Sequence, residues 1–186
     1  MDHWAGVVLA AGQGLRMNSK VPKVLHRVCG KELIRYPVEL LRDLGIPRIV
    51  VVVSPLSADA VEKLLGDGIE YVVQPAVLGE GDALQYTREA LQERTEHLLV
   101  LNADAPLLLP EMLQQLMRHH LAESHHMTLL TGRGMTAPDF GRVLRDDRGW
   151  VVAMVEAADA TTIRPGGPAE EVNGGIYCFR APWLWE

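Results

Sequence analysis

The sequence predicts an α/β protein with a doubly wound, mostly parallel sheet and a small antiparallel β addition toward its C-terminal end. Strand-like and helix-like segments alternate along most of the 186 residues, which is typical of a parallel sheet with crossover helices. Several of the strand-like segments are continuous apolar runs, as in strands that are covered on both faces. From Gly141 onward the pattern changes to short strands joined by hairpin-like turns. Together these observations predict a Rossmann-like fold.

In the first half of the chain, short apolar or β-branched runs predict strands, and apolar residues at helical spacing predict helices. Helices commonly stop at a glycine and start at a small polar residue. Gly45 follows the first predicted helix, and Ser57 is placed to cap the second, which ends before Gly66. In chain order the predicted segments are strand 6–9, helix 33–44, strand 48–53, helix 58–65, strand 69–73, helix 81–93 and strand 97–101.

In the second half, one amphipathic helix precedes a series of strands. Pro110 opens this helix, because proline suits the first turn, and its apolar spacing continues to about Ala122. The strands predicted after it are 127–131, 142–145, 151–156 and 176–179.

Size and composition favour a globular cytoplasmic enzyme of one domain, which we expect to cover residues 1–186. No apolar stretch reaches the roughly 20 residues needed to cross a bilayer, and Met1 to Trp4 does not resemble a signal peptide. Cys29 and Cys178 lack metal-ligand spacing. The net charge of −6 argues against nucleic acid as a partner. We therefore expect neither nucleic acid nor membrane as partners, while an oligomer is compatible with the sequence.

A glycine-rich loop follows the first predicted strand and is the main functional signal. Gly12 and Gly14 allow backbone N–H groups to close around an anion, and two cations, Arg16 and Lys23, follow in the same region. This combination favours a nucleoside triphosphate, with a solvated basic loop as the alternative. The dinucleotide-binding fingerprint would need a third glycine where Met17 stands, and no Walker A spacing precedes Gly30-Lys31, so neither motif applies.

Polar residues also follow other predicted strands, and ligands of open α/β sheets bind at the carboxyl ends of the strands. The loop after Leu9, Gln74-Pro75, Asn102-Ala103-Asp104 and the region near Glu156 are therefore expected to converge. Asp104 is the candidate Mg²⁺ ligand, since Mg²⁺ binds through one or two carboxylates plus phosphates and water. An Asx-turn role is the alternative for this residue.

The remaining candidates carry weaker signals. Gln74 offers an acceptor and a donor that match the edge of uracil, although a plain loop residue is the alternative. Glu156 and Asn173 suit sugar hydroxyls, and Gly141 allows close backbone approach, but surface turns would explain all three equally well. A cluster of histidines at a helix end is expected to be solvated rather than to bind metal: His119, His120, His125 and His126.

These motifs together resemble the N-terminal uridylyltransferase domain of the bifunctional N-acetylglucosamine-1-phosphate uridylyltransferases, within the sugar-phosphate nucleotidyltransferase superfamily. The resemblance spans nearly the whole chain and implies the fold of the nucleotide-diphospho-sugar transferases. The matching segments are Leu9-Ala10-Ala11-Gly12-Gln13-Gly14-Leu15-Arg16-Met17, Pro22-Lys23-Val24-Leu25, Gln74, Leu78-Gly79, Asp104-Ala105-Pro106-Leu107, Phe140-Gly141-Arg142 and 171–177.

The resemblance implies transfer of UMP from UTP to a sugar 1-phosphate, with Mg²⁺ as cofactor. It implies that Arg16 and Lys23 are catalytic, that Asp104 binds Mg²⁺, and that Gly141, Glu156 and Asn173 hold the amino sugar. The implied nucleotide-binding residues are Leu9, Ala10, Ala11, Gly12, Gly14, Gln74, Gly79 and Glu80. A phosphate monoester is mostly doubly ionised at neutral pH, its second pKa being about 6, so the nucleophile needs no general base.

Some positions depart from the family pattern. Leu15, Glu80 and Gly174 stand where the family has threonine, and Ala103 stands where it has glycine. Glu80 is expected to point outward or to meet a cation. By the same resemblance, a second metal ligand and an acetyltransferase domain would lie beyond Glu186. Another nucleotidyltransferase that uses CTP or a different sugar phosphate, and a non-catalytic nucleotide-binding module, remain alternatives.

Overall fold

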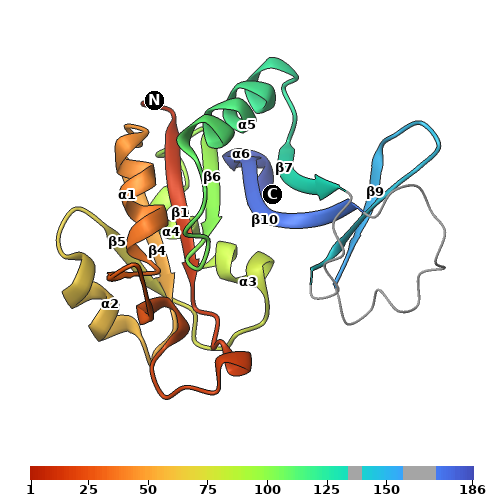
Figure 1. The fold of residues 1–186 in the computed structure, drawn as a ribbon. Coiled ribbons are helices and arrows are strands. Elements are labelled where there is room, and N and C mark those ends of the chain that lie inside the picture. The colour runs from red at the N-terminus through yellow and green to blue at the C-terminus, as the bar shows by residue number, and fades with distance from the viewer. Residues whose placement is uncertain (134–139, 157–170) are drawn as a thin grey trace. The chain divides into compact units, whose positions relative to one another are not determined.

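The structure, a computed structural model, describes residues 1–133, 140–156 and 171–186 (Figure 1). It is a mixed α/β protein with a mostly parallel sheet and a small antiparallel part, which confirms the predicted fold class. The chain forms two compact units: unit 1 is Met1–Thr128 with Tyr177–Glu186, and unit 2 is Leu129–Ile176. Each unit is described by itself below.

The sheet of unit 1 is centred on β1 (Trp4–Ala10), whose residues are all buried. β1 pairs in parallel with β4 (Arg48–Val53) on one side and with β6 (His97–Asn102) on the other. β5 (Glu70–Val73) extends the sheet in parallel beyond β4, and residues 177–180 of β10 (Glu171–Arg180) run antiparallel to β6. The predicted runs of valine and leucine thus form the centre of the sheet.

Helices cover this sheet, and α1 (Arg35–Asp43) lies along β1 in Figure 1. Gly6 of β1 makes this close packing possible, because a Cβ at that position would lie 2.6 Å from Leu41 Cδ1. The other helices are α2 (Ala58–Leu65), α3 (Glu80–Gln85), α4 (Arg88–Leu91), α5 (Pro110–Ala122) and α6 (Ala181–Leu184). In the described ranges, none of the helices combines the length and the apolar character that a membrane crossing requires.

Two predicted helices differ from the structure in detail. The helix expected over 81–93 is interrupted between α3 and α4, where the buried Thr87 donates its hydroxyl to the Leu84 carbonyl at 2.7 Å. Ser57 stands at the N-cap of α2, as expected, but makes no capping bond with its side chain. Its hydroxyl instead lies 2.9 Å from the hydroxyl of Ser54. In the first case the hydroxyl bonds a carbonyl in the last turn of α3, and in the second it bonds within the turn before α2.

Several short elements were not predicted. They are the 3-10 turns η1 (Leu15–Met17) and η2 (Lys23–Leu25), the hairpin of β2 (Arg27–Val28) and β3 (Lys31–Glu32), and the C-terminal helix α6. The last predicted strand is also longer than expected, since β10 begins at Glu171.

The expectation for the histidines is wrong at His120, which is only 1% exposed. Its Nε2 lies 3.3 Å from Nδ1 of His97, and its Nδ1 lies 2.9 Å from the hydroxyl of Thr128. The residue lies on the inner face of α5 and is covered by β6 and β7 (Met127–Arg133), whereas His119 and His126 are exposed. The polar neighbours of His120 in the sequence suggested an exposed side chain, but hydrogen-bond partners on β6 and β7 allow it to be buried.

Unit 2 contains the antiparallel strands β8 (Arg142–Arg145) and β9 (Val151–Val155), with the first residues of β10 paired to β8 at Val172. β7 also pairs with β10. The main charged interaction described in unit 2 involves the buried Glu171. Its carboxylate accepts hydrogen bonds of 2.7 Å from both Nε and Nη2 of Arg145 and is contacted by Arg133. These interactions lower the pKa of Glu171 to about 2, the hydrogen bonds from Arg145 being the main cause.

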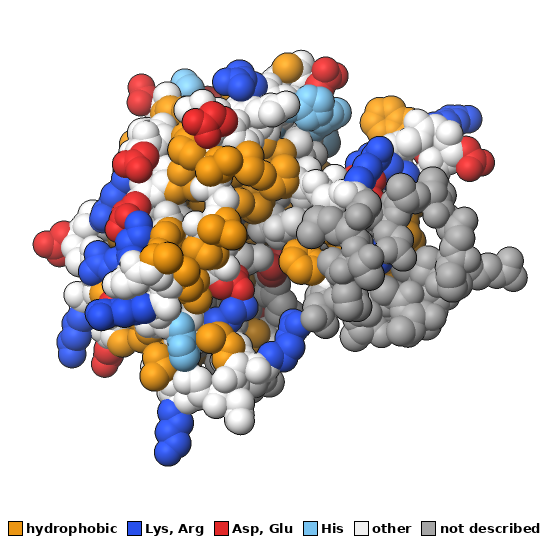
Figure 2. All heavy atoms as spheres, in the orientation of Figure 1, with side chains coloured by type: hydrophobic (Ala, Val, Ile, Leu, Met, Phe, Trp, Pro, Cys, Tyr) orange, Lys and Arg blue, Asp and Glu red, His pale blue; other side chains and the backbone are white. Residues whose placement is uncertain are grey.

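On the visible face of unit 1, acidic and basic side chains are interspersed around a hydrophobic strip (Figure 2). A mixed surface of this kind agrees with the modest net charge of −6. It presents no single-sign field of the type that attracts nucleic acid, within the described part of that face.

Candidate active site

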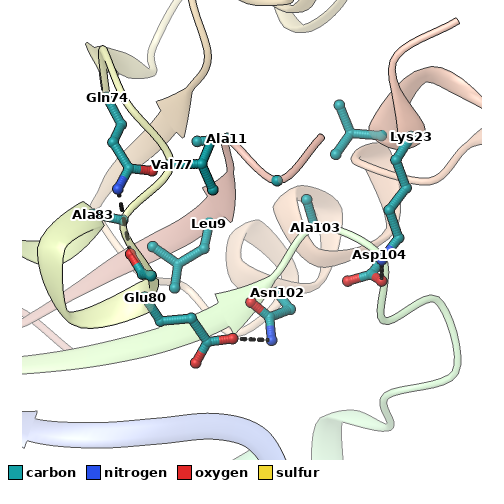
Figure 3. Close-up of a pocket in the computed structure, with 13 residues that line it drawn as sticks. Leu9, Ala11, Lys23, Gln74, Val77, Glu80, Ala83, Asn102, Ala103 and Asp104 are labelled. Atoms are coloured by element: carbon teal, nitrogen blue, oxygen red, sulfur yellow. Dashed lines mark hydrogen bonds and ion pairs between the residues drawn. The ribbon is translucent and has the colours of Figure 1, made fainter. Parts of the chain in front are cut away.

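Unit 1 contains a cavity of about 260 Å³ at the carboxyl ends of β1 and β6 (Figure 3). Three of the four segments expected to converge meet here: the loop after β1, Gln74 after β5, and the residues that follow β6. Two backbone hydrogen bonds tie these strand ends together, from Ala103 N to Leu9 O at 3.0 Å and from Gln74 N to Val53 O at 2.9 Å. The lining residues are Leu9, Ala11, Gly12, Lys23, Val24, Gln74, Val77, Gly79, Glu80, Ala83, Asn102, Ala103 and Asp104.

The remainder of the glycine-rich loop lines an adjoining cavity. Gly14, Arg16 and Met17 contribute to it, together with Lys23 and Val77, which border both cavities. Arg16 is exposed and lies in η1. Ala10 is the one residue of the expected loop set that is buried within β1 without lining either of these two cavities.

Gly14 determines how closely Lys23 approaches the loop. Its φ of +61° is unfavourable for a residue with a side chain, and a Cβ would lie 2.6 Å from Lys23 Cβ. The turn is closed by a hydrogen bond of 2.9 Å from Met17 N to Gly14 O. Glycine at this position therefore allows the stem of Lys23 to pack against the loop backbone.

Lys23 and Asp104 form an ion pair across the cavity, from η2 to the loop after β6 (Figure 3). Both side chains are 35% exposed. The described residues contain no group of three His, Cys, Asp or Glu side chains that could hold a metal by themselves. Mg²⁺ typically takes one or two carboxylates and completes its shell with phosphate oxygens and water, so a single carboxylate at Asp104 fits this ion when a phosphate is bound.

Gln74 is 1% exposed, and its carboxamide is held in one orientation. Its Nε2 donates to Oδ2 of Asp82 at 2.6 Å and to the carbonyl oxygen of Gly79 at 3.3 Å. Figure 3 shows the nitrogen turned toward α3 and the oxygen on the side of Ala11.

Glu80 is exposed and lines the cavity, and neutral donors, rather than the alternative of a cation, bond its carboxylate. One carboxylate oxygen accepts a hydrogen bond from Asn102 Nδ2 at 2.9 Å, and the other accepts one from the Tyr177 hydroxyl at 2.9 Å. Two neutral donors, on β6 and β10, hold the carboxylate at the wall between Gln74 and the Lys23–Asp104 pair (Figure 3).

The three residues expected to hold the sugar all lie in unit 2, where the structure brings them close to one another. Asn173 N donates to Gly141 O at 2.9 Å, and Asn173 Oδ1 accepts a hydrogen bond of 3.0 Å from Gly175 N. Glu156 is exposed and directly follows Val155, whose carbonyl oxygen would lie 3.2 Å from a Cβ at Gly141. The described geometry therefore places the expected nucleotide residues in unit 1 and the expected sugar residues in unit 2.

Sequence reasoning placed Asn102 in a converging segment without giving it a role, and it missed two other polar residues, Asp82 and Tyr177, that contact the cavity lining. Asn102 ends β6, so its position after an apolar run was a usable signal. Asp82 lies in the first turn of α3, where an acidic side chain is a common helix-start feature and gives no hint of a role. Tyr177 is 6% exposed and is part of an apolar strand, so its contact with Glu80 could not be foreseen.

Comparisons with known proteins identify relatives of the chain. Residues 6–161 match the family model described as a MobA-like NTP transferase domain. The chain is 40% identical over 179 residues to the bifunctional protein GlmU of Halalkalibacterium halodurans, which covers 96% of this chain and 39% of that protein. It is 39% identical over 186 residues to the bifunctional protein GlmU of Exiguobacterium sibiricum, covering 100% of this chain and 40% of that protein. The chain thus spans about two fifths of the length of these relatives.

A solved structure shares the fold. It comes from Bacillus anthracis, is described as a glucose-1-phosphate thymidylyltransferase and contains sucrose. It superposes with a TM-score of 0.76 at 17% sequence identity, over 97% of this chain and 73% of the other.

Proposed function

The chain belongs to the family of MobA-like NTP transferase domains, and on that premise we propose that it transfers UMP from UTP to N-acetylglucosamine 1-phosphate or a related sugar 1-phosphate. The products would be the UDP-sugar and pyrophosphate. One observation carries the proposal: a single cavity holds both the oriented carboxamide of Gln74, suited to a base, and the Lys23–Asp104 pair, suited to phosphates and a metal. The names of the 39–40% identical relatives agree with it.

The proposed reaction is an in-line displacement at phosphorus. A phosphate oxygen of the sugar 1-phosphate forms a bond to the α-phosphorus of UTP, and the bond from that phosphorus to the bridging oxygen of pyrophosphate breaks. No proton has to be removed from a nucleophile that is already ionised. The work of the site is therefore to hold the two phosphates in line and to neutralise their charge.

Lys23 and Arg16 would supply that neutralisation. Lys23 borders both cavities, so its ammonium group can reach a triphosphate that extends from one to the other. Arg16 lies in the second cavity, beside the glycine-rich backbone. Bound Mg²⁺ would add positive charge at the phosphates, with Asp104 as its protein ligand.

Gly141, Glu156 and Asn173 are the proposed contacts to the sugar. The amide and carboxylate groups of Asn173 and Glu156 match hydroxyl and N-acetyl groups. The missing side chain at Gly141 allows the Val155 carbonyl to approach closely, which brings Glu156 and Asn173 near the same backbone segment. We also propose that the reaction takes place in the cytoplasm.

A non-catalytic nucleotide-binding module is the second candidate, and Glu80 favours it. A carboxylate in the cavity wall adds negative charge near a bound triphosphate. CTP or a different sugar phosphate would be a third variant of the same reaction.

Pyrophosphate release from each of the four common nucleoside triphosphates, with N-acetylglucosamine 1-phosphate and Mg²⁺, distinguishes these possibilities. We expect turnover with UTP and not with CTP. Turnover with another nucleotide alone would overturn the assignment of the base. Thermal stabilisation by UTP without any pyrophosphate release would favour the binding module.

Replacing the charged pair tests the site itself. We expect Lys23→Ala and Asp104→Ala each to lower the rate of UTP-dependent pyrophosphate release by more than about tenfold, since charge-stabilising groups typically contribute a few kcal/mol to a transition state. Asp104→Ala should also weaken the Mg²⁺-dependent part of UTP binding, which calorimetry measures without turnover. Lys31→Ala is the matched control, because Lys31 pairs with Glu39 at 2.6 Å outside the cavity. Rates near those of the unmodified chain in both variants would show that the site lies elsewhere.

A further inference from the structure

The carboxamide of Gln74 has an N–H₂ end that donates and an oxygen end that accepts hydrogen bonds. The end that faces a ligand determines whether the site binds an acceptor or a donor on that ligand. Gln74 is 1% exposed, so its orientation is set by the protein rather than by water. Both acceptors near its Nε2 come from the start of α3: Oδ2 of Asp82 at 2.6 Å and the carbonyl oxygen of Gly79 at 3.3 Å.

Neither of these partners can tolerate the reversed amide. A carboxylate and a carbonyl are acceptors only, so a rotation of the amide by half a turn would place Oε1 against two oxygens. It would also leave a buried donor and acceptor unsatisfied, and both would lose hydrogen bonds without gaining contact with water. The Gly79 carbonyl is itself fixed, because it accepts the first hydrogen bond of α3 from Ala83 N at 3.1 Å.

With Nε2 held by α3, Oε1 is the atom that faces the cavity, on the side of Ala11 (Figure 3). An acceptor at this place requires a ligand edge with an N–H group. Uracil presents the N3–H donor between two carbonyl oxygens, whereas N3 of cytosine is an acceptor. A cytosine in the same position would set its N3 lone pair against Oε1.

We propose that Asp82 is a positioning residue that sets the base selectivity of the site, by holding Gln74 with its oxygen toward the nucleobase. This inference rests on the proposed function, in which Gln74 contacts the base of the nucleotide. Asp82 itself does not line the cavity. It acts on the ligand only through Gln74, so its removal should change discrimination between bases more than binding of the phosphates.

The test is calorimetric binding of UTP, CTP and 3-methyluridine triphosphate, which lacks the N3–H, to the full chain and its variants in Mg²⁺. We expect the unmodified chain to bind UTP at least about tenfold more tightly than either of the other two, as one lost hydrogen bond at an unpaired buried acceptor implies. In Asp82→Ala and Asp82→Leu, neither of which offers an acceptor to Gln74 Nε2, the preference for UTP over both should fall by about the same factor. Asp82→Leu preserves the approximate shape of the side chain and removes its acceptor, so it keeps the test usable if Asp82→Ala folds poorly.

Asp59→Ala is the matched control, because Asp59 is an exposed acidic residue in the first turn of α2. Its preference for UTP should equal that of the unmodified chain. If the chain binds UTP with preference, Gln74→Ala removes that preference, and both Asp82 variants retain it, then the positioning role is overturned while the proposed function stands. If the unmodified chain binds no nucleotide, the proposed function fails and this inference fails with it.

Discussion

At the scale of single residues, Gly14 shows how a missing side chain helps to position Lys23, a cation of the proposed site. A Cβ at this position would meet Lys23 Cβ at 2.6 Å, and the φ of +61° adds backbone strain of about 1 kcal/mol for any other residue. We expect Gly14→Ala to displace Lys23 from the cavity and to lower the rate of pyrophosphate release by more than about tenfold. Steady-state kinetics with UTP measure this loss.

Gly81→Ala provides the comparison for that variant. Gly81 lies in α3, and a Cβ there would meet nothing within 4 Å. Alanine stabilises a helix by about 1 kcal/mol relative to glycine, so this variant should keep its rate and unfold at a slightly higher temperature. A Gly14→Ala variant that retained its full rate would contradict the role given to the loop.

The sequence could predict single residues that follow an apolar run, and it failed where a partner comes from another element. Gln74 and Asp104 lie in the cavity wall because the carboxyl ends of parallel strands meet at one edge of a sheet. The partners of Glu80 could not be foreseen, since Asn102 and Tyr177 are 22 and 97 residues distant in the chain. Hydrogen bonds over such separations depend on the register of strands, which is a tertiary property.

At the scale of elements, long apolar runs were predicted well and short turns were not. β4 and α5 have the predicted bounds, because a β-branched run and an amphipathic run opened by proline are strong local signals. The hairpin of β2 and β3 has strands of two residues each, too short for any periodicity to show. His120, which was expected in solvent, belongs to α5. The bounds of this helix were predicted correctly, but the presence of a histidine on its buried face was not.

His120 gives the packing of α5 a dependence on pH. Burial is the main cause that lowers its pKa from 6.5 to about 4, and the neighbouring His97, whose pKa burial also lowers, adds to the effect. The unfolded chain therefore binds a proton that the folded chain excludes, and the stabilisation is complete above the unfolded pKa and is lost as the pH falls toward about 4. We expect the free energy of unfolding to drop by about 2 kcal/mol from this group between about pH 7.5 and pH 5.

Urea unfolding at the two pH values measures this drop. In His120→Gln it should become smaller, with a remainder from His97, although the variant also loses packing and should be less stable at both pH values. His119→Gln, on the exposed face of the same helix, should leave most of the drop in place, since His119 is the smallest of the causes that lower the pKa of His120. Glu171 does not interfere, because its pKa of about 2 lies below this range and its unfolded value of 4.5 contributes only toward lower pH. An equal drop in His120→Gln and the unmodified chain would refute the assignment.

At the scale of the whole molecule, the expected contacts to the two substrates belong to different compact units. Gln74, Lys23 and Asp104 lie in unit 1, whereas Gly141 and Asn173 lie in unit 2. For the proposed reaction, substitutions in unit 2 should therefore weaken binding of the sugar phosphate and leave the affinity for the nucleotide unchanged. We expect Asn173→Ala to raise the KM for the sugar 1-phosphate by about tenfold, the value of one or two hydrogen bonds to substrate.

Calorimetry with UTP supplies the second measurement for that variant. Its Kd should remain within about twofold of the unmodified value, since no binding group of unit 1 is altered. A change that merely loosens unit 2 would also lower the unfolding temperature, so thermal unfolding of Asn173→Ala separates contact loss from instability. Weaker UTP binding in Asn173→Ala, at unchanged stability, would argue against the division of substrate contacts between the units.

The ion pair of Lys23 with Asp104 makes the two ligands of the proposed site depend on each other. A triphosphate that arrives alone must draw Lys23 away and leave a carboxylate unpaired, and a divalent cation that arrives alone must do the reverse. When the metal and the triphosphate bind together, the cost of separating Lys23 from Asp104 is incurred only once. Binding of metal and nucleotide to the proposed site would thus be positively cooperative, and by linkage each would raise the affinity of the other by the same factor. The ion pair would therefore favour binding of the metal–nucleotide complex over binding of the metal or the nucleotide alone.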